Sequence, residues 1–160
     1  MRNRILKIIL WILVIIWMIT ILSFSKEPAE LSDKKSRSLV QIIMPLIEKL
    51  NIDISIEELN HYIRKTAHVF NYFTLMILLI FAFKLTFTNI KFKFLPPYIT
   101  ATIFSAIDEF FQTFINGRGG RLTDVLIDNI GILLAILLIY LIETTGTVHF
   151  VSTDKYHLNQ

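Results

Sequence analysis

Four carboxylates, two arginines and a glutamine lie between and inside two apolar runs near the middle of the chain. They fall in the segment 105–131, which reads SAIDEFFQTFINGRGGRLTDVLIDNIG. A charged side chain at the centre of a membrane helix costs about 2.5–3.5 kcal/mol on insertion scales. Because so many charged groups near one membrane face are costly without a use, the segment predicts a functional site.

Paired acids together with histidine, lysine and arginine suit phosphoester or acyl-transfer chemistry. Asp108 or Glu109 would exchange protons with His68, so these three are candidate catalytic residues. Guanidinium groups match the geometry of phosphate and carboxylate groups, which makes the two arginines candidates for substrate binding. The candidate substrate-binding residues of this segment and of the stripe described next are Arg118, Arg121, Lys65, Gln112, Tyr72, Asp124 and Asp128.

Helical spacing places these side chains on shared faces, because residues three, four or seven apart lie on one side of a helix. Lys65, His68 and Tyr72 follow this spacing and form one polar stripe. Three further pairs share a face in the same way: Asp108 with Gln112, Glu109 with Gln112, and Asp124 with Asp128.

The composition predicts an integral membrane protein. The chain has 160 residues, of which 54% are hydrophobic, and a mean hydropathy of +0.59. A membrane span needs about 17–25 mostly apolar residues, and four segments fit: 5–22, 66–86, 96–114 and 123–142. The first run is too long for a signal peptide and has no small-residue cleavage site, which favours an uncleaved anchor. We therefore predict a single domain over 1–160 that is all-α, a four-helix transmembrane bundle.

The connector 23–65 is predicted to hold an amphipathic helix in the membrane interface, between spans one and two. Its apolar positions repeat at helical spacing, with Pro45 as a possible kink. Ser55 and Glu58 have the spacing of a capping box that opens the helix of the second span. Three glycines in 117–120 predict a turn, and Thr123 is expected to cap the fourth helix. The apolar stripe comprises Leu39, Ile42, Ile43, Leu46, Ile47 and Leu50.

Basic residues flank the first span and the loop between spans two and three, which favours cytoplasmic N- and C-termini. These residues are Arg2, Arg4 and Lys7 at the N-terminus, and Lys84, Lys91 and Lys93 in the loop. The two sets lie at the end of the bundle opposite the polar cluster, although nine of the 16 basic residues then lie outside. The candidate site is therefore predicted to face outward, and the tail 143–160 is predicted to be cytoplasmic.

Several classes of function are disfavoured. The absence of cysteine excludes disulfides, thiolate chemistry and zinc sites built on sulfur. A net charge of +3 without a basic stripe gives no sign of nucleic-acid binding. The acids and His68 lack the tight spacing of known metal motifs, and the neighbouring arginine and lysine charges would compete with a metal for the carboxylates. Neither a metal nor another cofactor is therefore predicted.

Three segments of the chain resemble the VanZ-like family of membrane proteins. The most specific is Asp108-Glu109-Phe-Phe-Gln112 with Gly117-Arg118, followed by Asp124-Val-Leu-Ile-Asp128 and Gly131, which is similar to the family's DExxQxFxxGR…DVxxNxxG signature. The segment 65–75 resembles its KxxHxxxYxxL element. Phe24-Ser25 with Pro28 resembles its FSSQ-type element. The departures are Lys26 and Glu27 in place of Ser and Gln, Phe111 for His, Asn116 for Pro, and Asp128 for Asn.

The resemblance implies a multi-pass protein of the bacterial plasma membrane, associated with lowered susceptibility to teicoplanin-type antibiotics. It adds Ser25 to the candidate substrate-binding residues. The implied partners are membrane lipid and, at the outer leaflet, a cell-envelope precursor or the glycopeptide antibiotic itself. The resemblance implies no particular reaction and no oligomeric state.

Three interpretations of the polar cluster therefore stand. The cluster processes an anionic envelope molecule as an enzyme, binds such a molecule without turnover, or neutralises itself as a non-catalytic scaffold. In the scaffold interpretation the acids pair with Arg118, Arg121, Lys65 and a protonated His68. Transport fits least, because four spans with little polarity at mid-membrane offer no pathway.

Overall fold

The computed structural model describes residues 2–87 and 93–146, and all of their regular structure is helical. The prediction of an all-α fold is confirmed for these residues. Lys91 and most of the predicted tail lie outside the described residues. The five helices are α1 (Arg2–Ser25), α2 (Ala29–Lys49), α3 (Ile56–Thr86), α4 (Leu95–Gln112) and α5 (Leu122–Thr144).

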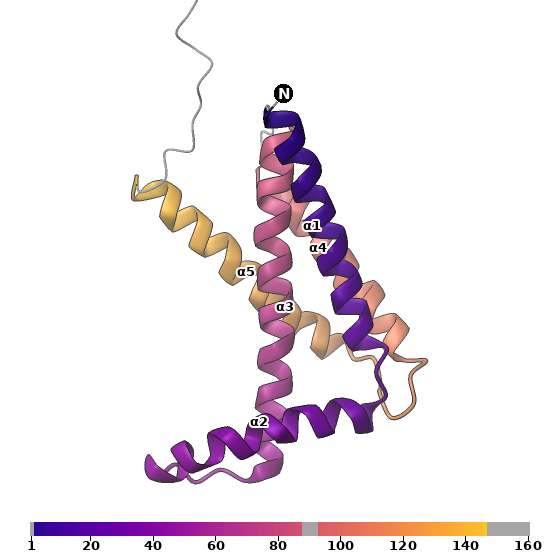
Figure 1. Ribbon diagram of the computed structural model, residues 1–160, viewed down its shortest axis with the longest axis vertical. Helices are drawn as coiled ribbons and strands as arrows, with labels where there is room; N and C mark the ends of the chain where they lie inside the picture. Colours follow the sequence, from indigo (N-terminus) through magenta and orange to yellow (C-terminus); the bar gives the residue numbers. More distant parts are fainter. Residues whose placement is uncertain (1, 88–92, 147–160) are drawn as a thin grey trace, which may run out of the picture.

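The long helix α3 is the centre of the arrangement (Figure 1). The helices α1 and α4 run beside it, α5 crosses it obliquely, and α2 runs across its lower part. The C-terminal end of α1 and the connection between α4 and α5 lie at the same end of the molecule. Polar residues that are distant in sequence therefore come to one end of the helices.

Three of the helices are long and apolar enough to cross a membrane: Arg4–Ser25, Ile56–Thr86 and Leu122–Thr144. The chain is accordingly a membrane protein. The helix α4 is not among the three, since its 18 residues end in a polar turn that contains Asp108, Glu109 and Gln112. The fourth span over 96–114 remains a prediction.

The helix α1 packs on α3 through one narrow stripe. Val14 and Ile21, seven residues apart, are buried, while most of the other side chains of α1 are exposed. The indole nitrogen of Trp17 donates to the carbonyl oxygen of Asn71 at 2.9 Å, and that of Trp11 donates to the Thr86 hydroxyl at 2.9 Å. The remaining apolar surface of α1 suits contact with lipid.

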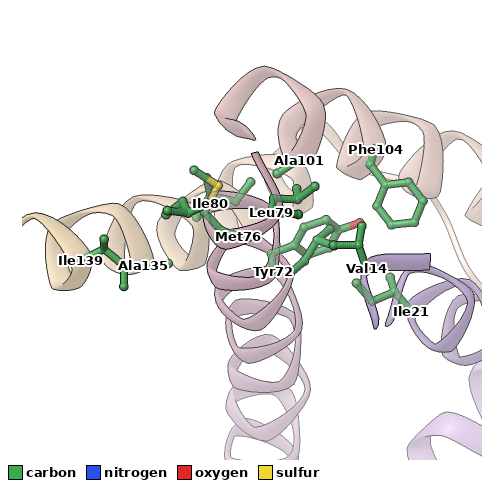
Figure 2. Packing of buried hydrophobic residues seen from close by; sticks show 13 residues of the cluster. Val14, Ile21, Tyr72, Met76, Leu79, Ile80, Ala101, Phe104, Ala135 and Ile139 are labelled. Carbon is green, nitrogen blue, oxygen red and sulfur yellow. The ribbon is translucent and has the colours of Figure 1, made fainter. Parts of the chain in front are cut away.

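The apolar core surrounds the middle of α3 (Figure 2). Tyr72, Met76 and Leu79 of α3 are buried against side chains of the other helices, among them Phe104 of α4. Tyr72 places its ring 6.3 Å from that of Phe104 and its hydroxyl among polar groups. This residue therefore connects the core to the polar end of the molecule.

The helices α3 and α5 approach each other closely at Gly131. A Cβ atom added there would lie 2.1 Å from the carbonyl oxygen of Val69 and 3.0 Å from the backbone nitrogen of Phe73. No side chain fits in this space, because real Cβ atoms do not approach backbone atoms so closely. Glycine is therefore required for the two helices to cross at this distance.

The helix boundaries confirm some of the local predictions. Ser55 caps α3, accepting from the backbone N–H of Glu58 while the Glu58 carboxylate accepts from the backbone N–H of Ser55. The helix then continues without interruption to Thr86, so the predicted second span is its C-terminal part. Pro45 lies inside α2.

The predicted cap of the fourth span is wrong. The residue at the cap position of α5 is Arg121, and it makes no side-chain capping bond. Because the helix begins at Leu122, Thr123 is already within the first turn, and its hydroxyl reaches only Asp124 at 3.5 Å.

The apolar stripe of α2 is only partly packed against the rest of the protein, since Ile43 and Ile47 are half-buried. Leu39, Ile42, Leu46 and Leu50 are all at least 49% exposed, whereas Val40 is buried. The location of this stripe in the membrane interface remains a prediction.

We expect Gly131→Ala to destabilise the protein by about 1–3 kcal/mol, because the added methyl group must push α3 and α5 apart. Thermal unfolding in detergent measures this as a lowered midpoint. Gly119→Ala is the control, since a Cβ atom there meets nothing within 4 Å and should leave the midpoint unchanged. Equal midpoints for both variants would contradict the close crossing.

Candidate functional site

All the candidate site residues come from segments that meet at one end of the molecule. Ser25 ends α1, the stripe 65–72 lies in α3, and the acids of α4 occupy its last turns. The loop 113–121 then leads to the first two turns of α5. The structure places around this end Ser25, Lys65, His68, Tyr72, Asp108, Glu109, Gln112, Arg118, Arg121, Asp124 and Asp128.

Asp108 is fully buried and joins three helices through one carboxylate oxygen. Its Oδ2 accepts a hydrogen bond from the Ser25 hydroxyl at 2.8 Å. The same oxygen lies 3.4 Å from the Tyr72 hydroxyl and 3.4 Å from the Gln112 amide nitrogen. The other oxygen, Oδ1, is buried and has no partner among the described residues.

Asp128 is also fully buried, and it joins α5 to α3 and α4. Its Oδ1 lies 3.1 Å from Nδ1 of His68, and its Oδ2 accepts from the Ser105 hydroxyl at 2.7 Å. Asp128 is one helical turn before Gly131, and His68 adjoins Val69. The close crossing of the two helices therefore brings this histidine and this carboxylate together.

Glu109 holds the loop that follows α4. One of its oxygens accepts from the Gln112 amide at 3.0 Å, and the other accepts from the backbone N–H of Arg121 at 3.2 Å. The backbone of the loop also approaches α4 closely, because a Cβ atom on Gly120 would lie 2.0 Å from the carbonyl oxygen of Glu109. The position of the loop is therefore fixed by one carboxylate and one glycine.

Lys65 and Asp124 form an ion pair between α3 and α5. Both side chains are partly buried, and Asp124 lies in the first turn of α5, where a negative charge suits the helix dipole. This pair closes one side of the polar end of the molecule.

His68, Glu109 and Asp128 could hold a metal ion by distance alone, because one ligand atom from each lies within 4.8 Å of the others. Each carboxylate oxygen of the two acids nevertheless already has a partner from the protein. A metal would have to replace these contacts. In this structure the protein's own donors therefore occupy the carboxylate oxygens that a metal would need.

A cavity of about 240 Å³, which we call the arginine cavity, opens between α3, the loop 113–121 and the start of α5. Its lining is strongly basic, and Asp124 is the one carboxylate residue in it. That carboxylate is paired with Lys65. The basic residues of the lining are His61, Arg64, Lys65, His68, Arg118 and Arg121.

The three arginines of this lining form no ion pair with a carboxylate among the described residues. Arg118 donates to the Gln112 side-chain oxygen at 3.4 Å, and its Nε is buried without a partner. The nearby Glu109 carboxylate accepts a hydrogen bond from the backbone N–H of Arg121. Three guanidinium groups around one cavity therefore have N–H donors that no carboxylate of the described residues pairs with.

Burial lowers the pKa of Arg118, and the nearby positive charge of Arg64 lowers it further. The arginine nevertheless remains charged, since guanidinium groups do not lose their proton in proteins. The carboxylates of Asp108, Glu27 and Glu109 act on Arg118 in the opposite direction, but none of them forms an ion pair with it among the described residues, so the two guanidinium groups favour the binding of an anion.

The scaffold interpretation paired the acids with Arg118, Arg121, Lys65 and a protonated His68, and the structure agrees with it in part. Lys65 and His68 pair with Asp124 and Asp128, whereas Asp108 and Glu109 have hydroxyl, amide and backbone N–H donors. Hydrogen bonds of this kind can satisfy a buried carboxylate without consuming a cation. The arginines are consequently available to a ligand.

The sequence analysis missed Arg64, His61 and Ser105. Helical spacing could have found the first two, because positions 61, 64, 65 and 68 share one face of α3. Ser105 shares a face with Asp108 and Gln112 by the same rule, and its bond to Asp128 shows the use of that position.

A comparison with protein families identifies a match over most of the chain. The family model described as VanZ/LLP1 matches residues 10–143, which are most of the chain and include every candidate site residue. No curated protein and no solved structure matches the chain at a significant level.

Proposed function

We propose that this chain, which belongs to the VanZ/LLP1 family, binds an anionic molecule of the cell envelope in the arginine cavity. The observation that carries the proposal is the set of three guanidinium groups without ion pairs around that cavity. Guanidinium groups bind phosphate or carboxylate oxygens through two parallel hydrogen bonds. Lys65, Gln112 and Asp124 complete the wall, with Asp124 holding Lys65 in place.

Turnover of the bound molecule is the second candidate function. The unpartnered, buried Oδ1 of Asp108 favours it, because a carboxylate oxygen without a donor is available to accept a proton. In this version Asp108 or Glu109 acts as the acid or base together with His68, while Ser25, Tyr72 and Asp128 orient these groups. The arginine cavity has the same role in both versions.

The molecule bound would be a constituent of the outer leaflet or of the growing cell wall. Family membership and the resemblance support a part in lowered susceptibility to teicoplanin-type antibiotics. Capture of an anionic envelope precursor, or of the charged groups of the antibiotic, would change how much of the drug reaches its target. Either ligand offers the carboxylate or phosphate groups that the arginines require.

In the membrane, we place the single domain 1–160 with four spans, of which α4 supplies the third. The helix α2 then lies in the outer interface, with its exposed apolar stripe against lipid. Both termini are cytoplasmic, and the arginine cavity faces outward from the bacterial plasma membrane. This placement leaves Lys84 and Lys93 at the cytoplasmic side, as basic flanks prefer.

Arg118→Ala tests the proposal. We expect wild-type protein to raise the minimum inhibitory concentration of teicoplanin in a susceptible host, and the variant to return it to that of the host alone. The physical reason is the loss of the buried guanidinium group that faces the ligand. Membrane levels are matched by immunoblot, and Arg37→Ala is the control because Arg37 is exposed on α2, away from the cavity.

Glu109→Gln separates the two versions of the function, because an amide retains the size of the side chain but is no acid or base. A variant that protects the host as well as wild type favours binding without turnover. Loss of protection at equal abundance favours chemistry. Full protection by Arg118→Ala would refute both versions.

The proposed orientation predicts that a cysteine in place of Gly119 reacts with membrane-impermeant thiol reagents in intact cells. Gly119 is exposed and lines the arginine cavity, and the chain has no native cysteine to give a background. Phe87→Cys is the control at the other end of α3 and should react only after the cells are opened. The reverse pattern of labelling would refute the outward-facing cavity.

A further inference from the structure

A second cavity, of about 300 Å³, opens between α1, α2 and α3, and we call it the chain groove. Figure 1 shows α2 starting below the C-terminal end of α1 and crossing the lower part of α3. Much of its lining is apolar, supplied by Ile21 and Phe24 of α1, Leu39 of α2 and Ile63 of α3. Each of the three helices therefore contributes apolar atoms to one concave surface.

The chain groove adjoins the arginine cavity. Arg64, His68 and Arg118 line both spaces. The two arginines thus have one side toward a basic space and the other toward an apolar space. A molecule held by these arginines would therefore have its next part beside the second space.

The mouth of the chain groove exposes apolar side chains. Phe24 is 48% exposed and Leu39 is 49% exposed, although both belong to the groove lining. Lys35 and Glu27 of the lining form an ion pair, and the buried Ser25 and Asp108 also line the groove, so apolar and polar side chains share its surface. A concave surface that combines apolar side chains with a few polar groups is typical of a ligand-binding groove.

We propose that the ligand is a single-chain amphiphile, with a phosphate-class headgroup in the arginine cavity and a hydrocarbon chain in the chain groove. The inference rests on the proposed function, since the arginine cavity must first hold an anion. Charge complementarity with the arginines favours an anionic headgroup, and the apolar side chains of the chain groove favour a hydrocarbon chain. A small soluble anion would leave the groove empty, and a neutral lipid would leave the arginines without a partner.

Binding of three probes tests this inference. The protein is placed in nanodiscs of phosphatidylcholine, and dodecyl phosphate, inorganic phosphate and dodecanol are titrated separately by calorimetry, with empty nanodiscs as the blank. We expect dodecyl phosphate to bind at least roughly tenfold more tightly than either of the other probes, because only it fills both spaces.

Two leucines of α2 provide a matched pair of variants. Leu39 lines the chain groove, whereas Leu46, seven residues later on the same helix, lines neither cavity and is 59% exposed. We expect Leu39→Asn to weaken dodecyl phosphate binding severalfold and to leave inorganic phosphate binding unchanged. Leu46→Asn should change neither value, and Arg64→Gln should weaken both phosphates.

The possible failures separate this inference from the proposed function. If the two phosphates bind wild-type protein equally and Arg118→Ala abolishes both, the chain groove has no ligand role, but the anion site stands. If dodecanol binds as tightly as dodecyl phosphate, the headgroup assignment is overturned. If neither phosphate binds, both proposals are wrong.

Discussion

The close crossing of α3 and α5 at Gly131 is the constraint on which the polar end of the molecule depends. The backbone of Val69 occupies the space that a side chain at Gly131 would need. His68 adjoins this contact on α3, and Asp128 precedes it by one turn on α5, so their bond of 3.1 Å follows from the crossing. The same approach of α3 and α5 allows Lys65, which lies one turn before His68 on α3, to pair with Asp124 of α5. A larger residue at the crossing would therefore disturb the site as well as the stability.

The partners of the buried acids determine which charged groups remain for a ligand. Asp108 and Asp128 are fully buried, yet their partners are hydroxyl groups, an amide and a histidine. The arginines of the loop and of α3 form no ion pair with a carboxylate among the described residues. The Arg118 side chain donates to Gln112, and its buried Nε has no partner in the described part of the chain. Lys65 and His68 do pair with Asp124 and Asp128, so the arginines are the cations that an anionic ligand would meet.

Much of this arrangement could be predicted from periodicity. The helical fold, the capping box at Ser55 and the shared level of the polar residues all follow from spacing along the chain. The partners of each acid could not be predicted, because they depend on which helices touch and at what distance. Arg64 was not predicted although it shares a face with His68, because the stripe of Lys65, His68 and Tyr72 accounts for the polar spacing of this helix without it. The prediction of Thr123 as the cap placed the start of α5 too late in the chain, because helix propensity does not fix a boundary to one residue.

The central claim is that an anionic amphiphile occupies the space around Arg118. The most direct measurement is mass spectrometry of the amphiphiles that copurify with the protein extracted from its own membrane in detergent-free polymer discs. Wild-type protein is compared with Arg118→Ala prepared in the same way. We predict an anionic species that is enriched with wild-type protein over the bulk membrane and depleted from the variant. The same composition in both preparations would contradict the claim.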